Sequence, residues 1–265
     1  MILNFIEDFF IYTGREILMN VELLNAIIAA GTSIIVVILS QILISSKDKK
    51  QARALETNNL LKEFLNPIRF MLAENYFRIN KIVEETQQKG KHDKILVINN
   101  AEEVIHKDTE WFVGEGCYLM SSCYFVACLF AYIEKIRRDI PFLKLPNHID
   151  TELIRRINKL VAGFSKNLNI YYAIQMNIGK EFYIKEEQRL ITYREFCEVV
   201  KDKANLCWYK PLITYFLRIA SGEYHETQYI LKDIKEFTKY LDEIVSGGDS
   251  IEQKILAEKE VAERL

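Results

Sequence analysis

Glycine and proline are scarce in this sequence, with 10 and 4 residues respectively among 265. Collagen-like and low-complexity chains depend on these residue types, so both classes are excluded. A hydrophobic content of 49% also excludes a disordered chain. So few turn-forming residues favour long helices over many short strands. We therefore expect a mainly α-helical protein.

An excess of charge of one sign is also lacking, because 35 Lys and Arg residues oppose 37 Asp and Glu residues. Phosphate backbones bind clustered positive surfaces, so we expect no nucleic-acid partner. The sequence has no phosphate-binding glycine loop, nucleophile elbow, HExxH zinc motif or EF-hand loop. We therefore expect no cofactor and no metal site, and the sequence indicates no particular reaction.

Cysteine is present without any metal-binding or redox spacing. No pair follows the CxxC pattern, and an odd number suits free thiols in a reducing compartment. We interpret the five cysteines as buried structural thiols. They are Cys117, Cys123, Cys128, Cys197 and Cys207.

One long apolar segment stands out, because Leu23 to Ser46 is 24 residues without a charge. As a helix it would be about 36 Å long, enough to cross a hydrocarbon core of about 30 Å with some tilt. A cleaved signal peptide would begin with basic residues, whereas the first charges here are Glu7 and Asp8. We predict an uncleaved transmembrane helix, with a buried core helix as the alternative.

Basic residues flank this segment unequally. Only Arg15 precedes it, whereas Lys47, Lys49, Lys50 and Arg53 follow it closely. Cytoplasmic flanks carry the excess of Lys and Arg, so the protein is predicted to be single-pass with its N-terminus outside and its C-terminal domain in the cytoplasm.

A second uncharged stretch, Gly116 to Ile133, has 18 residues, the lower limit for a span. If it crossed the membrane, Lys135, Arg137 and Arg138 would lie outside, against the positive-inside rule. We expect it to be the central helix of the cytosolic domain, and a second span is the alternative.

These signals divide the chain into four parts. Residues 1–22 form a short extracytoplasmic segment, and residues 23–46 form the transmembrane helix. Residues 47–248 form a cytosolic α-helical domain, and residues 249–265 form a charged C-terminal tail helix.

Apolar residues at three- and four-residue steps predict amphipathic helices over 61–83 and 230–244. Asp150 suits the N-cap of a helix that runs to about Leu168, and 171–180 is also expected to be helical. Pro67 interrupts the first, so we expect a break near Asn66, and Gly90 ends it. The short apolar run 95–98 suits either a helix or a strand.

A small β-hairpin is predicted inside the helical domain. The segments 182–184 and 190–192 flank a polar loop over 185–189. Thr192 and Glu195 have the spacing of a capping box, which predicts that a new helix begins directly after the hairpin.

Polar residues in two helical regions are candidates for ligand binding. Arg137 and Arg138 close the central helix, where cations also complement the helix dipole. With Arg155 they would form a basic pocket for a phosphate-bearing signal. Gln175 and Glu181 lie in an aromatic helix, where they would line a pocket or form a buried network that holds the hairpin.

Small and polar side chains form a stripe along the predicted transmembrane helix. Such side chains make the contact surface between helices in lipid, where the hydrophobic drive between helices is weak. We predict self-association through this stripe, with a chance pattern on a monomeric anchor as the alternative. The predicted interface residues are Asn25, Ala29, Thr32, Ser33 and Ser40.

Two stretches resemble a recurring pattern in uncharacterised bacterial helical proteins, which often carry an N-terminal membrane helix. The first is CYLMSSCY at 117–124 with IRRDIPFL at 136–143, and the second is QMNIGKE at 175–181 with YREF at 193–196. The resemblance covers residues 110 to about 200. It departs from the pattern at Met176 and Asn177, where small or basic residues are expected, and it implies no activity.

The leading hypothesis is a membrane-anchored, self-associating interaction or sensor module of the bacterial inner (cell) membrane. An antiphage or stress-response membrane effector is one concrete form of it. The expected partners are the lipid bilayer, further copies of the chain and a protein from the same operon. The alternatives are a membrane-tethered enzyme with an unrecognised active site and a structural accessory subunit of a membrane complex.

Overall fold

The structure is a computed structural model that describes residues 61–139 and 149–245. The chain divides into two compact units, Met1–Asn59 and Leu60–Leu265, and the described residues belong to the second. Several predicted features lie outside the described residues. They are the transmembrane helix 23–46, the interface residues Asn25, Ala29, Thr32, Ser33 and Ser40, and the tail helix 249–265.

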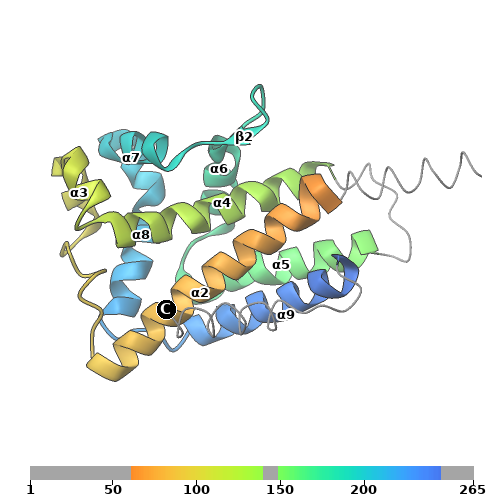
Figure 1. Ribbon diagram of the computed structural model, residues 1–265, viewed down its shortest axis with the longest axis horizontal. Coiled ribbons are helices and arrows are strands. Elements are labelled where there is room, and N and C mark those ends of the chain that lie inside the picture. Colours follow the sequence, from red (N-terminus) through yellow and green to blue (C-terminus); the bar gives the residue numbers. More distant parts are fainter. Residues whose placement is uncertain (1–60, 140–148, 246–265) are drawn as a thin grey trace, which may run out of the picture. The chain divides into compact units, whose positions relative to one another are not determined.

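The described part of the second unit is mainly helical with one tiny sheet, which confirms this part of the predicted fold (Figure 1). Short helices and strands link the longer helices. The elements are η1 (Leu61–Leu65), α2 (Asn66–Lys89), η2 (Ala101–His106), α3 (Thr109–Val113), α4 (Cys117–Asp139), α5 (Ile149–Leu168), α6 (Tyr172–Phe182), β1 (Tyr183–Ile184), β2 (Arg189–Leu190), α7 (Tyr193–Lys201), α8 (Lys203–Ala220) and α9 (Thr227–Val245).

Five of these helices contact one another in a closed order. α4 packs on α2, α2 on α9, α9 on α5, α5 on α6, and α6 returns to α4 (Figure 1). Each helix therefore needs an apolar stripe facing the shared interior. Phe130 of α4 and Phe164 of α5 meet there edge to face, with ring centroids 5.1 Å apart.

The helix α2 begins where the sequence predicts a break. Pro67 sits in its first turn, where a missing backbone N–H removes no helical hydrogen bond. The preceding turn, η1, is a π-helix rather than a continuation of the same α-helix. Gly90 ends α2 as predicted, in a left-handed conformation with φ of 79° that favours glycine.

The helix α4 is long and apolar enough to cross a membrane, and it is the only helix in the described ranges that passes this test. It nevertheless contacts α2, α6, α7 and α8, and 61% of its most apolar stretch of 18 residues is buried inside the protein. A helix enclosed on several sides is apolar around most of its circumference. This packing agrees with the prediction of a central core helix.

A buried amide fixes how α2 lies against α4. The side chain of Asn75 is 1% exposed, and its Nδ2 donates to the carbonyl oxygens of Met71, at 2.8 Å, and Phe125, at 2.9 Å. A buried amide that lost these bonds would carry a desolvation cost, so the pairing favours one register of the two helices.

The predicted hairpin is present and antiparallel, with Tyr183 opposite Leu190 and Ile184 opposite Arg189. The capping box follows it as predicted. The Glu195 backbone N–H donates to Thr192 Oγ1 at 3.2 Å, and the Thr192 N–H donates to the Glu195 carboxylate at 2.5 Å. These reciprocal bonds start α7 directly after the second strand.

Other local predictions differ from the structure in detail. The run 95–98 is neither helix nor strand, although Ile95 and Ile98 are buried in the core. Among the cysteines, Cys123, Cys128 and Cys197 are buried as predicted, while Cys117 is half-buried. Cys207 is exposed on α8, so the prediction of a buried thiol is wrong at that position.

Candidate functional site

A concavity of about 350 Å³ opens where α4, α6 and the hairpin meet. Four of its lining residues carry positive charge and one carries negative charge. The lining residues are Ala131, Glu134, Lys135 and Arg138 of α4, Gly179 and Lys180 of α6, and Tyr183 and Lys185 of the hairpin. The α4 members lie at three- and four-residue steps, so they share one face of that helix.

Gly179 allows α6 to approach α4 closely beneath this concavity. A Cβ atom at that position would lie 2.6 Å from the carbonyl oxygen of Phe130 and 2.8 Å from Cγ of Glu134. Because α6 ends at Phe182 and β1 follows at once, this close approach also places the hairpin beside the end of α4.

Lys135 lies at the centre of the contacts around the concavity. Its ammonium nitrogen is 4.9 Å from the ring centroid of Phe64 and 5.1 Å from that of Tyr183. It also donates to the carbonyl oxygen of Glu63 at 3.5 Å. These contacts are neutral, so they orient the ammonium without cancelling its charge.

The other charges of the concavity are only partly balanced. Asp139 accepts two hydrogen bonds from Arg138, at 2.7 and 3.0 Å, and this raises the pKa of Arg138. Glu134 pairs with Arg137 outside the lining, at 3.4 Å. Within the described ranges, no carboxylate forms an ion pair with Lys135, Lys180 or Lys185. The site is therefore positive, and it suits a phosphate or carboxylate group.

Of the five ligand-binding residues predicted from the sequence, only Arg138 lines this concavity. Arg137 turns towards α5, where it donates to Asn158 Oδ1 at 2.6 Å and lies 4.9 Å from the ring centroid of Tyr172. Arg155 is held by Glu152 on its own helix through two hydrogen bonds of 2.7 Å.

The two remaining predicted residues contribute to separate contacts. Gln175 is 2% exposed, and its Nε2 donates to the carbonyl oxygens of Val161, at 3.0 Å, and Ile170, at 2.6 Å. It therefore closes the connection between α5 and α6. Glu181 accepts from Asn177 at 2.9 Å and from Tyr209 at 3.4 Å, so it braces α6 against α8.

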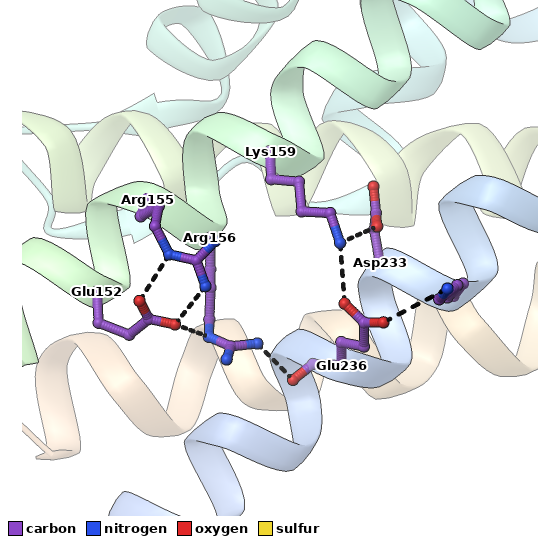
Figure 2. A network of polar contacts seen from close by, with 7 residues as sticks. Glu152, Arg155, Arg156, Lys159, Asp233 and Glu236 are labelled. Carbon is purple, nitrogen blue, oxygen red and sulfur yellow. Dashed lines mark hydrogen bonds and ion pairs between the residues drawn. The ribbon is translucent and has the colours of Figure 1, made fainter.

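Two basic residues of α5, Arg156 and Lys159, join α5 to α9. Figure 2 shows Lys159 between Asp233 and Glu236, at 2.8 Å from each carboxylate. Arg156 donates to Glu152 at 2.6 Å and to the carbonyl oxygen of Glu236 at 3.0 Å. These cations already have partners, so this network is a structural brace rather than an open anion site.

Apart from Arg138, none of the lining residues was predicted, including the three lysines Lys135, Lys180 and Lys185. Each of these lysines lies in a different element, and nothing in the local sequence indicates that the three line one concavity. The sequence feature that could have indicated this site was the basic run of Lys135, Arg137 and Arg138 at the end of an apolar helix. The packing of α6 and the hairpin against that end of α4 adds the other lining residues.

A second polar cluster lies around His92, whose side chain is 1% exposed. Its ring stacks on Tyr118 with centroids 5.4 Å apart, and Nε2 lies 3.3 Å from a Glu85 carboxylate oxygen. Burial lowers the pKa of His92. The described ranges contain no group of three or more His, Cys, Asp or Glu side chains suited to a metal ion. We interpret this cluster as structural.

No protein-family model matches the chain, and no curated protein or solved structure shows significant similarity to it. The comparisons therefore carry no argument about function.

Proposed function

We propose that this chain is a membrane-anchored interaction and sensor module that acts by self-association. In this proposal residues 23–46 cross the bacterial inner membrane once, and the helical unit lies on the cytoplasmic side. The observation that carries the proposal is a 24-residue uncharged segment, followed by a basic flank and attached to a separate compact helical unit.

The geometry of the helical unit supports a binding role over a catalytic one. Its buried polar side chains, such as Asn75 and Gln175, hold helices together rather than converge on a cavity. The concavity beside α4 offers positive charge but no paired acid and base. An antiphage or stress-response effector is one form of such a module. A tethered enzyme and a structural accessory subunit are the competing proposals.

Membrane insertion and topology provide the first test. A reporter enzyme fused after Leu265 is expected to behave as cytoplasmic, and the chain is expected to stay in the membrane fraction after alkaline carbonate. A periplasmic reporter signal would reverse the proposed orientation. Release by carbonate would contradict the anchor itself.

Self-association is tested in the membrane by crosslinking. Replacing Asn25 and Ser33 by Leu removes polar and small groups from the predicted interface, so the crosslinked fraction should fall while insertion is kept. The matched control replaces Ile27 and Ile34 by Leu on the opposite, aliphatic side. Equal crosslinking of both double variants would contradict the predicted interface.

A further inference from the structure

We propose that the basic concavity between α4, α6 and the hairpin binds the phosphate groups of acidic lipids on the cytoplasmic membrane surface. The inference rests on the proposed membrane anchor and adds a binding surface and a ligand class to it. The four cations concerned are Lys135, Arg138, Lys180 and Lys185.

The concavity lies at the end of the helical unit where the chain enters it. Lys135 contacts both Glu63 and Phe64, which belong to η1, the first described element. Only 15 positions separate Leu61 from Ser46, the last residue of the proposed span. Even a fully extended chain of that length reaches no further than about 54 Å. The length of the chain therefore limits how far Leu61 can lie from the proposed anchor.

The composition of the concavity suits a lipid headgroup surface. The exposed ammonium groups of Lys180 and Lys185 can offer donors to phosphate oxygens in varied positions. Lys135 adds an oriented ammonium, and Arg138, already bonded to Asp139, adds positive charge. Tyr183 adds an aromatic ring whose hydroxyl donates to Gln188 at 2.8 Å, so it has an apolar body with a polar tip. Aromatic residues of this kind are typical of the membrane interface.

The exposure of these cations favours a tethered ligand over a free one. Lys180, Lys185 and Arg138 are exposed, so each contact with phosphate is weakened by water and salt. A soluble phosphate compound would need a more enclosed site to bind well. An anchored domain meets the lipid surface at high effective concentration, so weak contacts suffice. Each cation near an acidic lipid surface increases the binding constant about fivefold.

The test uses the full chain in lipid nanodiscs of two compositions, phosphatidylcholine alone and phosphatidylcholine with phosphatidylglycerol. Mass spectrometry follows the acylation rate of individual lysines. We expect Lys180 and Lys185 to react about fivefold more slowly in the acidic discs. Lys232, an exposed lysine on α9, should react equally in both. Raising the salt to about 1 M should abolish the difference, because charges are then screened within about 3 Å.

A double variant tests whether the concavity itself makes the contact. Replacing Lys180 and Lys185 by Gln should abolish the lipid-dependent slowing of backbone hydrogen exchange in the hairpin. The matched control replaces Lys232 and Lys239, both exposed on α9, and should keep the slowing. Loss of the slowing in both variants would indicate a general charge effect and would overturn the proposal.

Three other outcomes would also overturn it. Equal acylation rates in both discs, with the chain resistant to carbonate, would remove the lipid contact and leave the anchor intact. If inorganic phosphate or inositol hexakisphosphate slowed the acylation of Lys180 and Lys185 in phosphatidylcholine discs, the concavity would be assigned to a soluble anion. A chain that carbonate extracts from both discs would overturn the anchor and this inference together.

Discussion

Arg69 of α2 and Asp242 of α9 form an ion pair between residues 173 positions apart, and their side chains are only 16% and 9% exposed. The pair joins the first long helix of the described unit to the last. Because both charges are largely desolvated, each depends on the other far more than a surface pair would.

Removing one partner of this pair should lower the free energy of unfolding more than replacing both partners by apolar residues. The single variant Asp242→Asn leaves Arg69 without its anionic partner, so we expect the free energy of unfolding to fall by about 3 kcal/mol. The double variant Arg69→Met with Asp242→Leu should lie closer to the wild type, as urea denaturation would show. The exposed brace at Lys159 is the control, since Lys159→Gln should cost no more than about 1 kcal/mol. Equal costs at the two places would contradict the role of burial.

Substitution by alanine should destabilise the protein more at Gly179 than at Gly163, another helical glycine. A Cβ atom there would meet the Phe130 backbone at 2.6 Å, so Gly179→Ala should lower the free energy of unfolding by about 2 kcal/mol. Gly163→Ala is the matched control, because its Cβ would meet side-chain atoms alone, namely Ile230 Cδ1 at 2.7 Å and Asp233 Oδ2 at 3.4 Å. The far end of the Ile230 side chain can shift, and alanine favours the helix by up to about 1 kcal/mol. A similar loss in both variants would argue against the close α4–α6 contact.

His92 should make stability depend on pH. Burial lowers its pKa in the folded protein, whereas in the unfolded chain it titrates near the ordinary value of about 6.5. The folded state therefore binds fewer protons, and stability should be full above that value and fall as the pH decreases below it.

Chemical denaturation between pH 5 and 8 measures this effect. The variant His92→Phe keeps an aromatic ring against Tyr118 and should lose the pH-dependent step. The variant His225→Gln, at an exposed position, should keep it. An unchanged pH slope in His92→Phe would assign the dependence to other groups.

Thiol reactivity should separate the cysteines by burial. Cys207 is exposed and should react first with an aromatic disulfide reagent. Burial raises the pKa of Cys128 to about 12, so very little of it is the reactive thiolate at pH 8. Peptide mapping of the folded protein should therefore find Cys207 labelled long before Cys128. The variant Cys207→Ser should remove the fast phase, and rapid labelling of Cys128 would contradict its place in the core.

Local sequence signals predicted the elements whose causes are local. Gly90 ends α2, Thr192 and Glu195 cap α7, and the polar loop 185–189 joins two paired strands. In each case the deciding interaction spans only a few residues. The prediction of a helix or strand over 95–98 was wrong, because this run packs against segments far away in the sequence. Beside it, the His92 backbone N–H donates to the carbonyl oxygen of Ala220 at 2.9 Å, in α8.

The candidate site was harder to predict from the sequence, because its residues come from distant parts of the chain. Arg137 and Arg138 are neighbours in the chain, but they point towards different elements, α5 and the hairpin. Lys135 and Lys185 are fifty positions apart and line one concavity. Their convergence follows from the packing of α6 on α4, which no short pattern encodes.

The amide of Asn75 also has a mechanical consequence. It bonds to the carbonyl oxygen of Phe125 across the α2–α4 contact, so sliding one helix along the other would leave its buried donor unpaired. The next equivalent position lies about 5.4 Å away, one full helical turn. We therefore expect a displacement of α2 along its axis to carry α4 with it as one body. The end of α4 that bears Lys135 and Arg138 would then shift together with α2.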